Sequence, residues 1–176
     1  MAVDMGHYSL WLLPTGEQQL RLAETIDRLS LDHGGPRFDP HLTLLGGLDG
    51  AAAPFAAATE RLAASLPPIR LRLQDIAFGD ERYRCLYLRV EQQDDLMAAH
   101  REALRLFGRK DDPAFLPHLS LLYGTLSPDT RTAIAATLGE WRAVACQAGR
   151  LRLVATGGGP SSWRSVRECV LSFRGC

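Results

Sequence analysis

A chain of 176 residues is long enough for one ordinary domain or for two small lobes that share a core. Its 20 basic and 20 acidic residues balance, which gives no support for a protein that coats nucleic acid through a broadly basic face and leaves room for a locally positive cleft. No apolar run is long enough to cross a bilayer, and a hydrophobic fraction of 46% is typical of a soluble globular chain.

Two sets of predicted elements follow each other in the same order along the chain. The first set is a strand, a helix, a polar motif and an Ala-rich helix, at Tyr8–Leu13, Glu17–Leu31, around His41 and at Ala52–Ser65. The second set has the same members, at Arg84–Val90, Asp94–Phe107, around His118 and from Ser127 to Leu138.

Each set then continues into alternating strands. These begin at Arg70-Leu-Arg-Leu and at Arg150-Leu-Arg-Leu, and a last strand is predicted at Cys169–Phe173. The chain is therefore two copies of one unit, and we predict an α+β protein with antiparallel sheets. A single domain over residues 1–176, with interleaved lobes related by a pseudo-two-fold axis, would bring the motifs at 41–44 and 118–121 face to face.

The two polar motifs are the most similar segments of the two copies. They read FDPHLTLLGG at Phe38–Gly47 and FLPHLSLLYG at Phe115–Gly124. Because alternate residues of a strand point to the same side, His41 and Thr43 share one face, as do His118 and Ser120. The leucines that alternate with these polar residues occupy the opposite face and are expected to pack under the helices: Leu42, Leu44, Leu119 and Leu121.

Two histidines and two hydroxyls around one point suit the hydrolysis of a phosphate ester. Imidazoles with a pKa of ~6.5 can supply one base and one acid at neutral pH. The hydroxyls can hold phosphoryl oxygens, and no metal is needed. A dihistidine metal site lacks a third ligand at a recognisable spacing. A purely structural repeat explains the shared leucines, prolines and glycines but not the two polar pairs.

The other candidates are assigned structural roles. The remaining histidines lie at a strand start, a helix end and a helix face, and we expect His7, His33 and His100 to be surface residues. Gly34–Gly35 predicts a helix stop, and Gly157–Gly159 predicts a turn or mobile loop near the site.

The cysteines indicate a reducing compartment. They form no CxxC pair and no cluster with histidine, at Cys85, Cys146, Cys169 and Cys176. We therefore expect buried or incidental thiols and a cytoplasmic protein.

The paired motifs resemble those of the two-histidine (2H) phosphoesterase superfamily, and the match is best to its cyclic phosphodiesterase branch, known from plants and yeast. The segments that carry the resemblance are GGPRFDPHLTLLGG at Gly34–Gly47, FLPHLSLLYG at Phe115–Gly124 and YSLWLLP at Tyr8–Pro14. In element order the resemblance covers the whole chain, although its specific part is about thirty residues long.

The resemblance implies both an architecture and a reaction. It implies two lobes, each a small antiparallel sheet with two outer helices, that face each other across a central water-filled cleft. It also implies hydrolysis, without metal or cofactor, of nucleoside 2′,3′-cyclic phosphates to 2′-phosphates and of ADP-ribose 1″,2″-cyclic phosphate to ADP-ribose 1″-phosphate, a step downstream of tRNA splicing. His41 and His118 would be the catalytic pair, and Thr43 and Ser120 would bind the phosphate.

Further roles follow from the same resemblance. Tyr123 would face the cleft only if Gly124 or a local bend re-aims it, because strict alternation from Ser120 points it away. Trp11 would stack on a base or pack in the core, and the core is favoured. By family analogy His118 is the base for the attacking water, and His41 is the acid for the leaving oxygen.

Two alternative functions stay open. One is an RNA 2′,3′-cyclic 3′-phosphodiesterase or 2′-5′ RNA ligase-like enzyme that uses the same histidines on an RNA end. The other is a module that binds a nucleotide or an RNA end without turning it over. We expect a monomer that binds a small cyclic-phosphate nucleotide or an RNA end and that does not associate with a membrane. The Ala/Arg/Leu-rich composition resembles that of a GC-rich bacterium, where the tRNA-splicing substrate is not expected.

Overall fold

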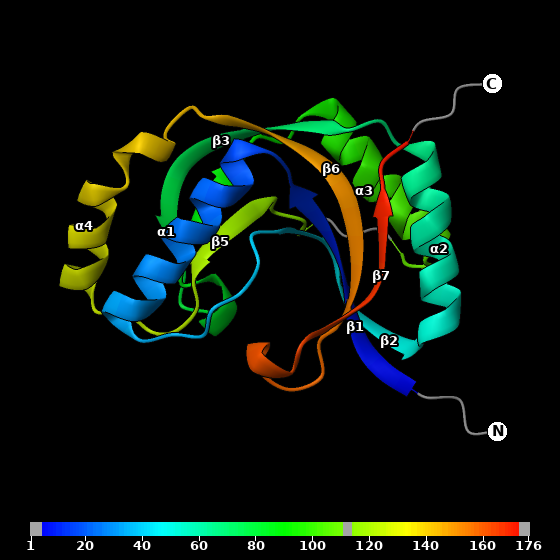
Figure 1. The fold of residues 1–176 in the computed structure, drawn as a ribbon, viewed down its shortest axis with the longest axis horizontal. Helices are drawn as coiled ribbons and strands as arrows, with labels where there is room; N and C mark the ends of the chain where they lie inside the picture. The colour runs from blue at the N-terminus through cyan, green and yellow to red at the C-terminus, as the bar shows by residue number, and fades with distance from the viewer. Residues whose placement is uncertain (1–4, 111–113, 173–176) are drawn as a thin grey trace.

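The computed structural model describes residues 5–110 and 114–172, which form seven strands, four α-helices and three 3₁₀ turns (Figure 1). The strands are β1 (Met5–Pro14), β2 (Leu42–Ala51), β3 (Ile69–Phe78), β4 (Leu86–Val90), β5 (His118–Leu122), β6 (Ala145–Ala155) and β7 (Arg164–Val170). The helices are α1 (Glu17–His33), α2 (Ala52–Ser65), α3 (Asp94–Leu106) and α4 (Pro128–Thr137). The 3₁₀ turns are η1 (Arg82–Arg84), η2 (Gly139–Trp141) and η3 (Pro160–Ser162).

The element order agrees with the sequence analysis, and two strands have other bounds: the strand predicted at Arg84–Val90 is β4, which begins at Leu86 after the turn η1. The bounds predicted for the last strand, Cys169–Phe173, are wrong, because β7 pairs with β6 from Arg164 to Val170. Leu171 follows β7, donates its N–H to the carbonyl oxygen of Gly149 at 2.9 Å and is buried, with 3% exposed. Phe173 lies outside the described residues.

The strands form one antiparallel sheet in the order β1-β2-β5-β4-β3-β6-β7, with a further pairing of β1 with β6. Strand β6 is one junction between the two halves of the molecule: its first residues pair with β3 and the remainder pairs with β1 and β7. The second junction is the pair Leu42–Leu119, which joins β2 to β5. This pair brings the two motif strands side by side, so His41 and His118 each lie one residue before it.

Helices cover the outer face of the sheet, with α1 and α4 on one half and α2 and α3 on the other (Figure 1). Helix α1 packs on β5 and α3 packs on β2, so each motif strand is covered by the helix that precedes the other motif in the chain. The motif leucines are buried beneath these helices, as predicted. The α+β class with an antiparallel sheet and outer helices is therefore confirmed, and the two predicted sheets are joined into one.

A β-bulge interrupts each motif strand at the leucine after the hydroxyl residue. Register shifts leave Leu44 as an extra residue in β2 and Leu121 as an extra residue in β5. An extra residue reverses the alternation of the strand. The two consecutive leucines after each hydroxyl residue therefore both enter the core, and the residue after them turns to the other face. That residue is Tyr123, directly after the end of β5, and Gly46 in β2.

His100 is buried, so its prediction as a surface residue is wrong. Its ring is 3% exposed, lies parallel to the ring of Phe115 at a centroid distance of 3.7 Å and places Nδ1 2.9 Å from the carbonyl oxygen of Leu44. It lies on the buried face of α3 and ties that helix to β2. His7 and His33 are exposed, as predicted.

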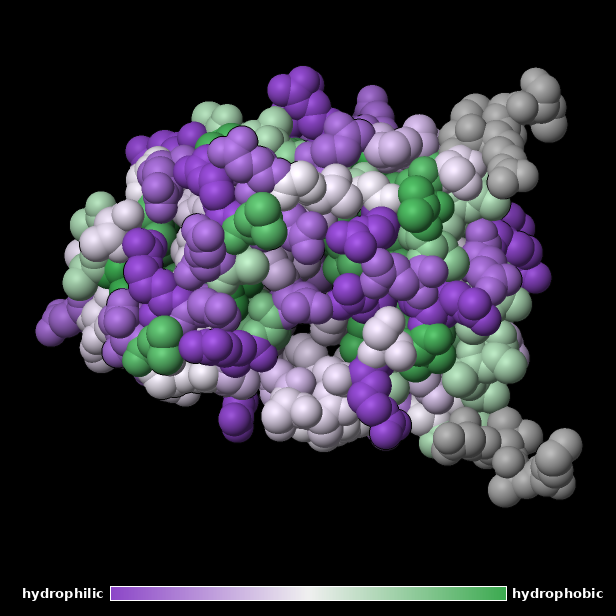
Figure 2. Space-filling view, in the orientation of Figure 1, coloured by the Kyte–Doolittle hydropathy of each residue, from purple (hydrophilic) through white to green (hydrophobic). Residues whose placement is uncertain are grey.

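Hydrophilic residues dominate the face shown in Figure 2, and hydrophobic ones are scattered among them. No helix in the described part of the chain is both long and apolar enough to cross a membrane.

Candidate active site

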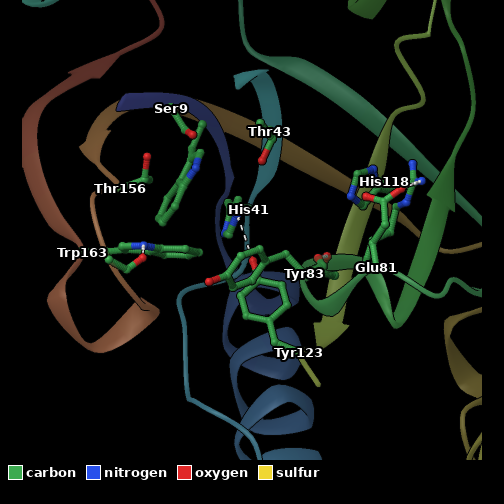
Figure 3. A pocket seen from close by; sticks show the side chains of 13 residues that line it. Ser9, His41, Thr43, Glu81, Tyr83, His118, Tyr123, Thr156 and Trp163 are labelled. Carbon is green, nitrogen blue, oxygen red and sulfur yellow. Dashed lines mark hydrogen bonds and ion pairs between the residues drawn. The ribbon is translucent and has the colours of Figure 1, made fainter. Parts of the chain in front are cut away.

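A cavity of about 340 Å³ lies on the sheet face that the helices leave open (Figure 3). Every site residue predicted from the sequence lines it: Trp11, His41, Thr43, His118, Ser120 and Tyr123. Residues far apart in the chain therefore meet at one site, because β2 and β5 are neighbours and β1 pairs with β2.

Both histidines are held by the same backbone contact. Nδ1 of His41 lies 2.7 Å from the carbonyl oxygen of Asp39, and Nδ1 of His118 lies 2.8 Å from that of Leu116. Since a carbonyl oxygen only accepts hydrogen bonds, Nδ1 carries a proton in each ring. In both residues Nε2 is therefore the atom that gains or loses a proton.

His41 is the more deeply buried of the two histidines. It is 5% exposed, and its ring lies flat on the ring of Trp11 at a centroid distance of 3.7 Å. Burial, reinforced by the charge of His118, lowers the pKa of His41 to about 4, against the opposing effect of the hydrogen bond to Asp39. In the free protein His41 is therefore neutral near pH 7 and can accept a proton at Nε2.

His118 has a more open surrounding. Its ring meets the ring of Tyr87 edge-on, with the centroids 5.3 Å apart. Burial and the positive charge of Arg84 lower the pKa of His118, while the hydrogen bond to Leu116 and the charge of Glu81 act in the opposite direction. The charge of Glu81 thus partly offsets the lowering of the His118 pKa.

The two hydroxyls differ in what they already contact. Thr43 is half-buried and makes no side-chain hydrogen bond within the described residues. Ser120 is 5% exposed and donates to the carbonyl oxygen of Tyr83 at 3.0 Å. To donate to a ligand oxygen, the hydroxyl of Ser120 must first rotate away from Tyr83. The hydroxyl of Thr43 can donate without breaking such a bond.

Tyr123 lines the cavity because the bulge at Leu121 re-aims it. Its hydroxyl lies 3.5 Å from Nε2 of His41, and its ring stacks on that of Phe38 at a centroid distance of 3.7 Å. Burial raises the pKa of Tyr123, so its phenol stays protonated and can donate. The local bend required by the sequence analysis is present in β5.

The sequence analysis favoured a place for Trp11 in the core, but Trp11 does not join the main core. It forms a small separate cluster with Leu13 and Val154, against which Trp163 packs. One face of its indole is occupied by His41. Trp11 therefore forms a wall of the cavity and orients His41.

Several lining residues were missed by the sequence analysis: Ser9, Glu81, Tyr83, Arg84, Thr156 and Trp163. Ser9 could have been found, because it lies two residues before Trp11 on β1 and alternation places both on one face. Gly158 belongs to the glycine loop predicted to lie near the site, and Trp163 follows that loop. Nothing in the pattern around Tyr83 and Arg84 indicated that they belong to the site.

Within residues 5–110 and 114–172, no group of three or more His, Cys, Asp or Glu side chains is arranged to hold a metal ion. The titratable groups that line the cavity are instead two histidines, two tyrosines, one glutamate and one arginine. Such a set can exchange protons at two nitrogens and donate hydrogen bonds to an anion.

Comparison with known proteins places this geometry in a family. Residues 15–160 match the 2′-5′ RNA ligase superfamily. A cyclic phosphodiesterase of Arabidopsis thaliana is 27% identical over 128 residues, which cover 70% of this chain and 68% of that protein.

Solved structures share the fold. E. coli LigT in its apo form matches with a TM-score of 0.63 at 20% identity, over 96% of this chain and 98% of that chain. The protein TT0787 of Thermus thermophilus matches with a TM-score of 0.63 at 20% identity, over 96% of this chain and 100% of that chain. E. coli LigT has also been crystallised with 3′-AMP, and that structure matches with a TM-score of 0.59 at 20% identity, over 96% and 99% of the two chains. The resemblance predicted from the motifs is thereby confirmed.

Proposed function

Since this chain belongs to the 2′-5′ RNA ligase superfamily, we propose that it is a cyclic phosphodiesterase that opens nucleoside 2′,3′-cyclic phosphates, and ADP-ribose 1″,2″-cyclic phosphate, to the 2′- or 1″-phosphomonoester without a metal. One observation carries the proposal: His41 and His118 use Nδ1 in identical backbone contacts and line one cavity with Thr43 and Ser120. The name of the Arabidopsis relative supports the same reaction.

The reaction needs two proton transfers on opposite sides of the phosphorus. One neutral histidine takes a proton from water as the water oxygen forms a bond to phosphorus. The bond from phosphorus to the 3′ oxygen breaks, and the second, protonated histidine gives its proton to that oxygen. The phosphate stays on the 2′ oxygen, and the histidines recover their starting states by exchanging a proton through water.

We take His41 as the base and His118 as the acid, and the surroundings of the two histidines in the free protein support this choice. Burial lowers the pKa of His41 to about 4, whereas burial lowers the pKa of the less buried His118 against the opposing effects of the hydrogen bond to Leu116 and the charge of Glu81. This order is the reverse of the one suggested by family analogy. Thr43, Ser120 and the phenol of Tyr123 then donate to the phosphoryl oxygens, where negative charge grows as water attacks.

The proposal is tested on 2′,3′-cyclic AMP in excess EDTA, with the products separated by chromatography or by phosphorus NMR. We expect turnover that chelation does not change and a product that is almost only 2′-AMP, because the cavity walls differ on its two sides and admit the sugar in one sense. The His41→Ala/His118→Ala double variant is the control for contaminating activity. Loss of turnover in EDTA that zinc or manganese restores would contradict the proposal, and an even mixture of 2′-AMP and 3′-AMP would contradict the fixed sugar orientation.

A second candidate substrate, an RNA end, is favoured by one feature beside the cavity. A groove of about 500 Å³ is lined by Arg70, Arg72, Arg89 and Arg142, together with Asp75 and Glu91. Arg89 pairs directly with His118 across β4 and β5, so the groove continues the sheet face that carries the site. Its arginines could contact the phosphates of a chain whose terminal cyclic phosphate occupies the cavity.

The two substrates are separated by comparing kcat/KM for 2′,3′-cyclic AMP with that for a short oligoribonucleotide ending in a 2′,3′-cyclic phosphate. Arg70 and Arg89 form no ion pair in the described part of the chain, so Arg70→Gln/Arg89→Gln removes charge without exposing a carboxylate. If the groove binds RNA, this variant has a lower kcat/KM for the oligonucleotide, and that kcat/KM depends less on salt, whereas the values for 2′,3′-cyclic AMP do not change. Equal kcat/KM values for both substrates in both proteins would contradict the binding of an RNA chain in this groove.

A further inference from the structure

Arg84 lines the cavity although it belongs to neither motif. It ends the turn η1, which connects β3 to β4 and also brings Glu81 and Tyr83 to the cavity wall. Among the described residues that line the cavity, Arg84 is the one permanently charged cation. The remaining donors there are hydroxyls and imidazoles.

Hydrogen bonds hold the turn η1 against the second motif. The hydroxyl of Ser120 donates to the carbonyl oxygen of Tyr83 at 3.0 Å, and the N–H of Gly124 donates to that of Arg82 at 2.9 Å. These contacts lie at the two ends of the segment from Ser120 to Gly124. The backbone that carries Arg84 is therefore fixed relative to the motif that supplies His118.

The guanidinium of Arg84 is held but only partly used. One of its terminal nitrogens donates to Glu81, and its carbon lies 5.9 Å from the centre of the Tyr87 ring. Its Nε is buried and has no partner within the described residues. A guanidinium has five N–H donors, and the bond to Glu81 is the one side-chain hydrogen bond that Arg84 forms in the described part of the chain.

A second arginine near the site shows the contrast. Arg152 lies behind His41, outside the cavity, and donates to both Asp39 and Glu168. Its charge is matched by two carboxylates, which is typical of a structural arginine. Arg84 has one carboxylate partner, Glu81, whose side chain is 70% exposed, while that of Arg84 is 30% exposed. Water screens that pair, so an anion that enters the cavity can compete with Glu81.

We propose that Arg84 is a third phosphate-binding group, which donates from its guanidinium to a phosphoryl oxygen of the substrate beside His118, with Glu81 holding it in the empty cavity. The proposal rests on the proposed function, because the anion is the substrate's phosphate. A cyclic phosphodiester carries one negative charge and gains a second as water attacks. A guanidinium stabilises that charge more strongly than neutral hydroxyls do, because its hydrogen bonds are charge-assisted.

The experiment compares wild type with Arg84→Gln, Arg84→Lys and the matched control Arg82→Gln. Arg82 lies in the same turn, but it is exposed and does not line the cavity. Inorganic phosphate is used twice: as a competitive inhibitor of 2′,3′-cyclic AMP hydrolysis and as a ligand in calorimetric titration. We expect Arg84→Gln to weaken phosphate binding and kcat/KM by about tenfold or more, Arg84→Lys to fall between, and Arg82→Gln to stay within about twofold.

A pH profile separates binding from mere structural support. The groups that face His118 are Arg84 and Glu81 from the turn, Tyr87 and Arg89 from β4, and His41 across the cavity. Because the charge of Arg84 lowers the pKa of His118, Arg84→Gln should move the alkaline limb of kcat/KM to higher pH. Arg82→Gln should leave that limb unchanged.

Glu81→Gln provides an independent variant if Arg84→Gln fails to fold. Removing the competing carboxylate should tighten phosphate binding severalfold, and unchanged or weaker binding would contradict the proposal. An Arg84→Gln protein that binds phosphate as tightly as wild type would overturn it. Wild type without activity on cyclic nucleotides would instead refute the proposed function, and the calorimetric comparison of wild type with Arg84→Gln would still decide the role of Arg84.

Discussion

The two motif halves carry the same backbone contact and differ in nearly everything around it. Behind His41, the carboxylate of Asp39 pairs with Arg152, which also pairs with Glu168, so an ion-pair network anchors the residue whose carbonyl oxygen contacts Nδ1. Behind His118, the corresponding carbonyl belongs to Leu116, which has no charge to fix it. The aromatic neighbours also differ, since Trp11 lies flat on His41 and Tyr87 meets His118 edge-on.

The residues after the two bulges show the same divergence. In β5 the bulge turns Tyr123 toward His41, while in β2 the equivalent position is Gly46, which offers no side chain. The first half therefore encloses its imidazole more deeply, and the second half is more open and flanked by Arg84 and Glu81. A duplicated motif can supply two identical groups, and their neighbours then assign them different protonation states.

Removing either imidazole tests the comparison with the largest expected effect. His41→Ala and His118→Ala should each lower kcat by about 10²- to 10⁴-fold, the usual contribution of a general base or acid. The double variant should lose far less than the product of the two losses, because the histidines act as one unit. Steady-state kinetics on 2′,3′-cyclic AMP measures this, and a loss below about threefold for either residue would require another proton carrier.

Removing the hydroxyls tests the two halves at the phosphate. Thr43→Ala and Ser120→Ala should each raise KM by about tenfold and change kcat less, as expected for hydrogen bonds to a charged ligand. Thr43→Ala should have the larger effect, since Ser120 must first give up its bond to Tyr83. Valine at position 43 serves as the control for shape. Equal losses in kcat and kcat/KM would instead mean that the hydroxyls act only in the transition state.

The ion pairs behind His41 give a smaller effect and test whether the network orients the imidazole. Arg152→Gln frees Asp39 and should lower kcat by about fivefold, because a small misplacement of a catalytic group is costly. Arg150→Gln is the matched control: Arg150 also pairs with Glu168, at 2.8 Å, and forms no ion pair with Asp39. Similar losses in both variants would indicate a general effect on the sheet.

Much of the site could be predicted because the repeat marks it in the sequence. Alternation along a strand explains why His41 and Thr43 share a face, and the adjacency of β2 and β5 explains why they meet the second pair. The two bulges could not be predicted, because an extra residue is visible only in the register with the neighbouring strand. The repeated pair of leucines is their trace in the sequence.

Other differences have separate causes. His100 follows Leu96 by one helical turn and was thus on the buried face of α3, but a polar residue there invites a surface assignment until its partner in β2 is known. Arg84 and Tyr83 reach the cavity only through the hydrogen bonds of a turn that has no sequence pattern. The order of the two histidine pKa values depends on burial and neighbours, which the symmetric motifs do not encode.

The dependence of kcat/KM on pH tests the central claim most directly, because it reports the free enzyme's base and acid. As pH falls through the His41 pKa of about 4, the base becomes protonated and activity falls. As pH rises through the pKa of His118, which lies below 6.5, the acid loses its proton and activity falls again. We expect a bell-shaped profile for 2′,3′-cyclic AMP, with its maximum between the pKa of His41 and the pKa of His118. A flat profile from about pH 5 to about pH 9, or activity that rises to a plateau above neutrality, would contradict the pairing of a neutral His41 with a protonated His118.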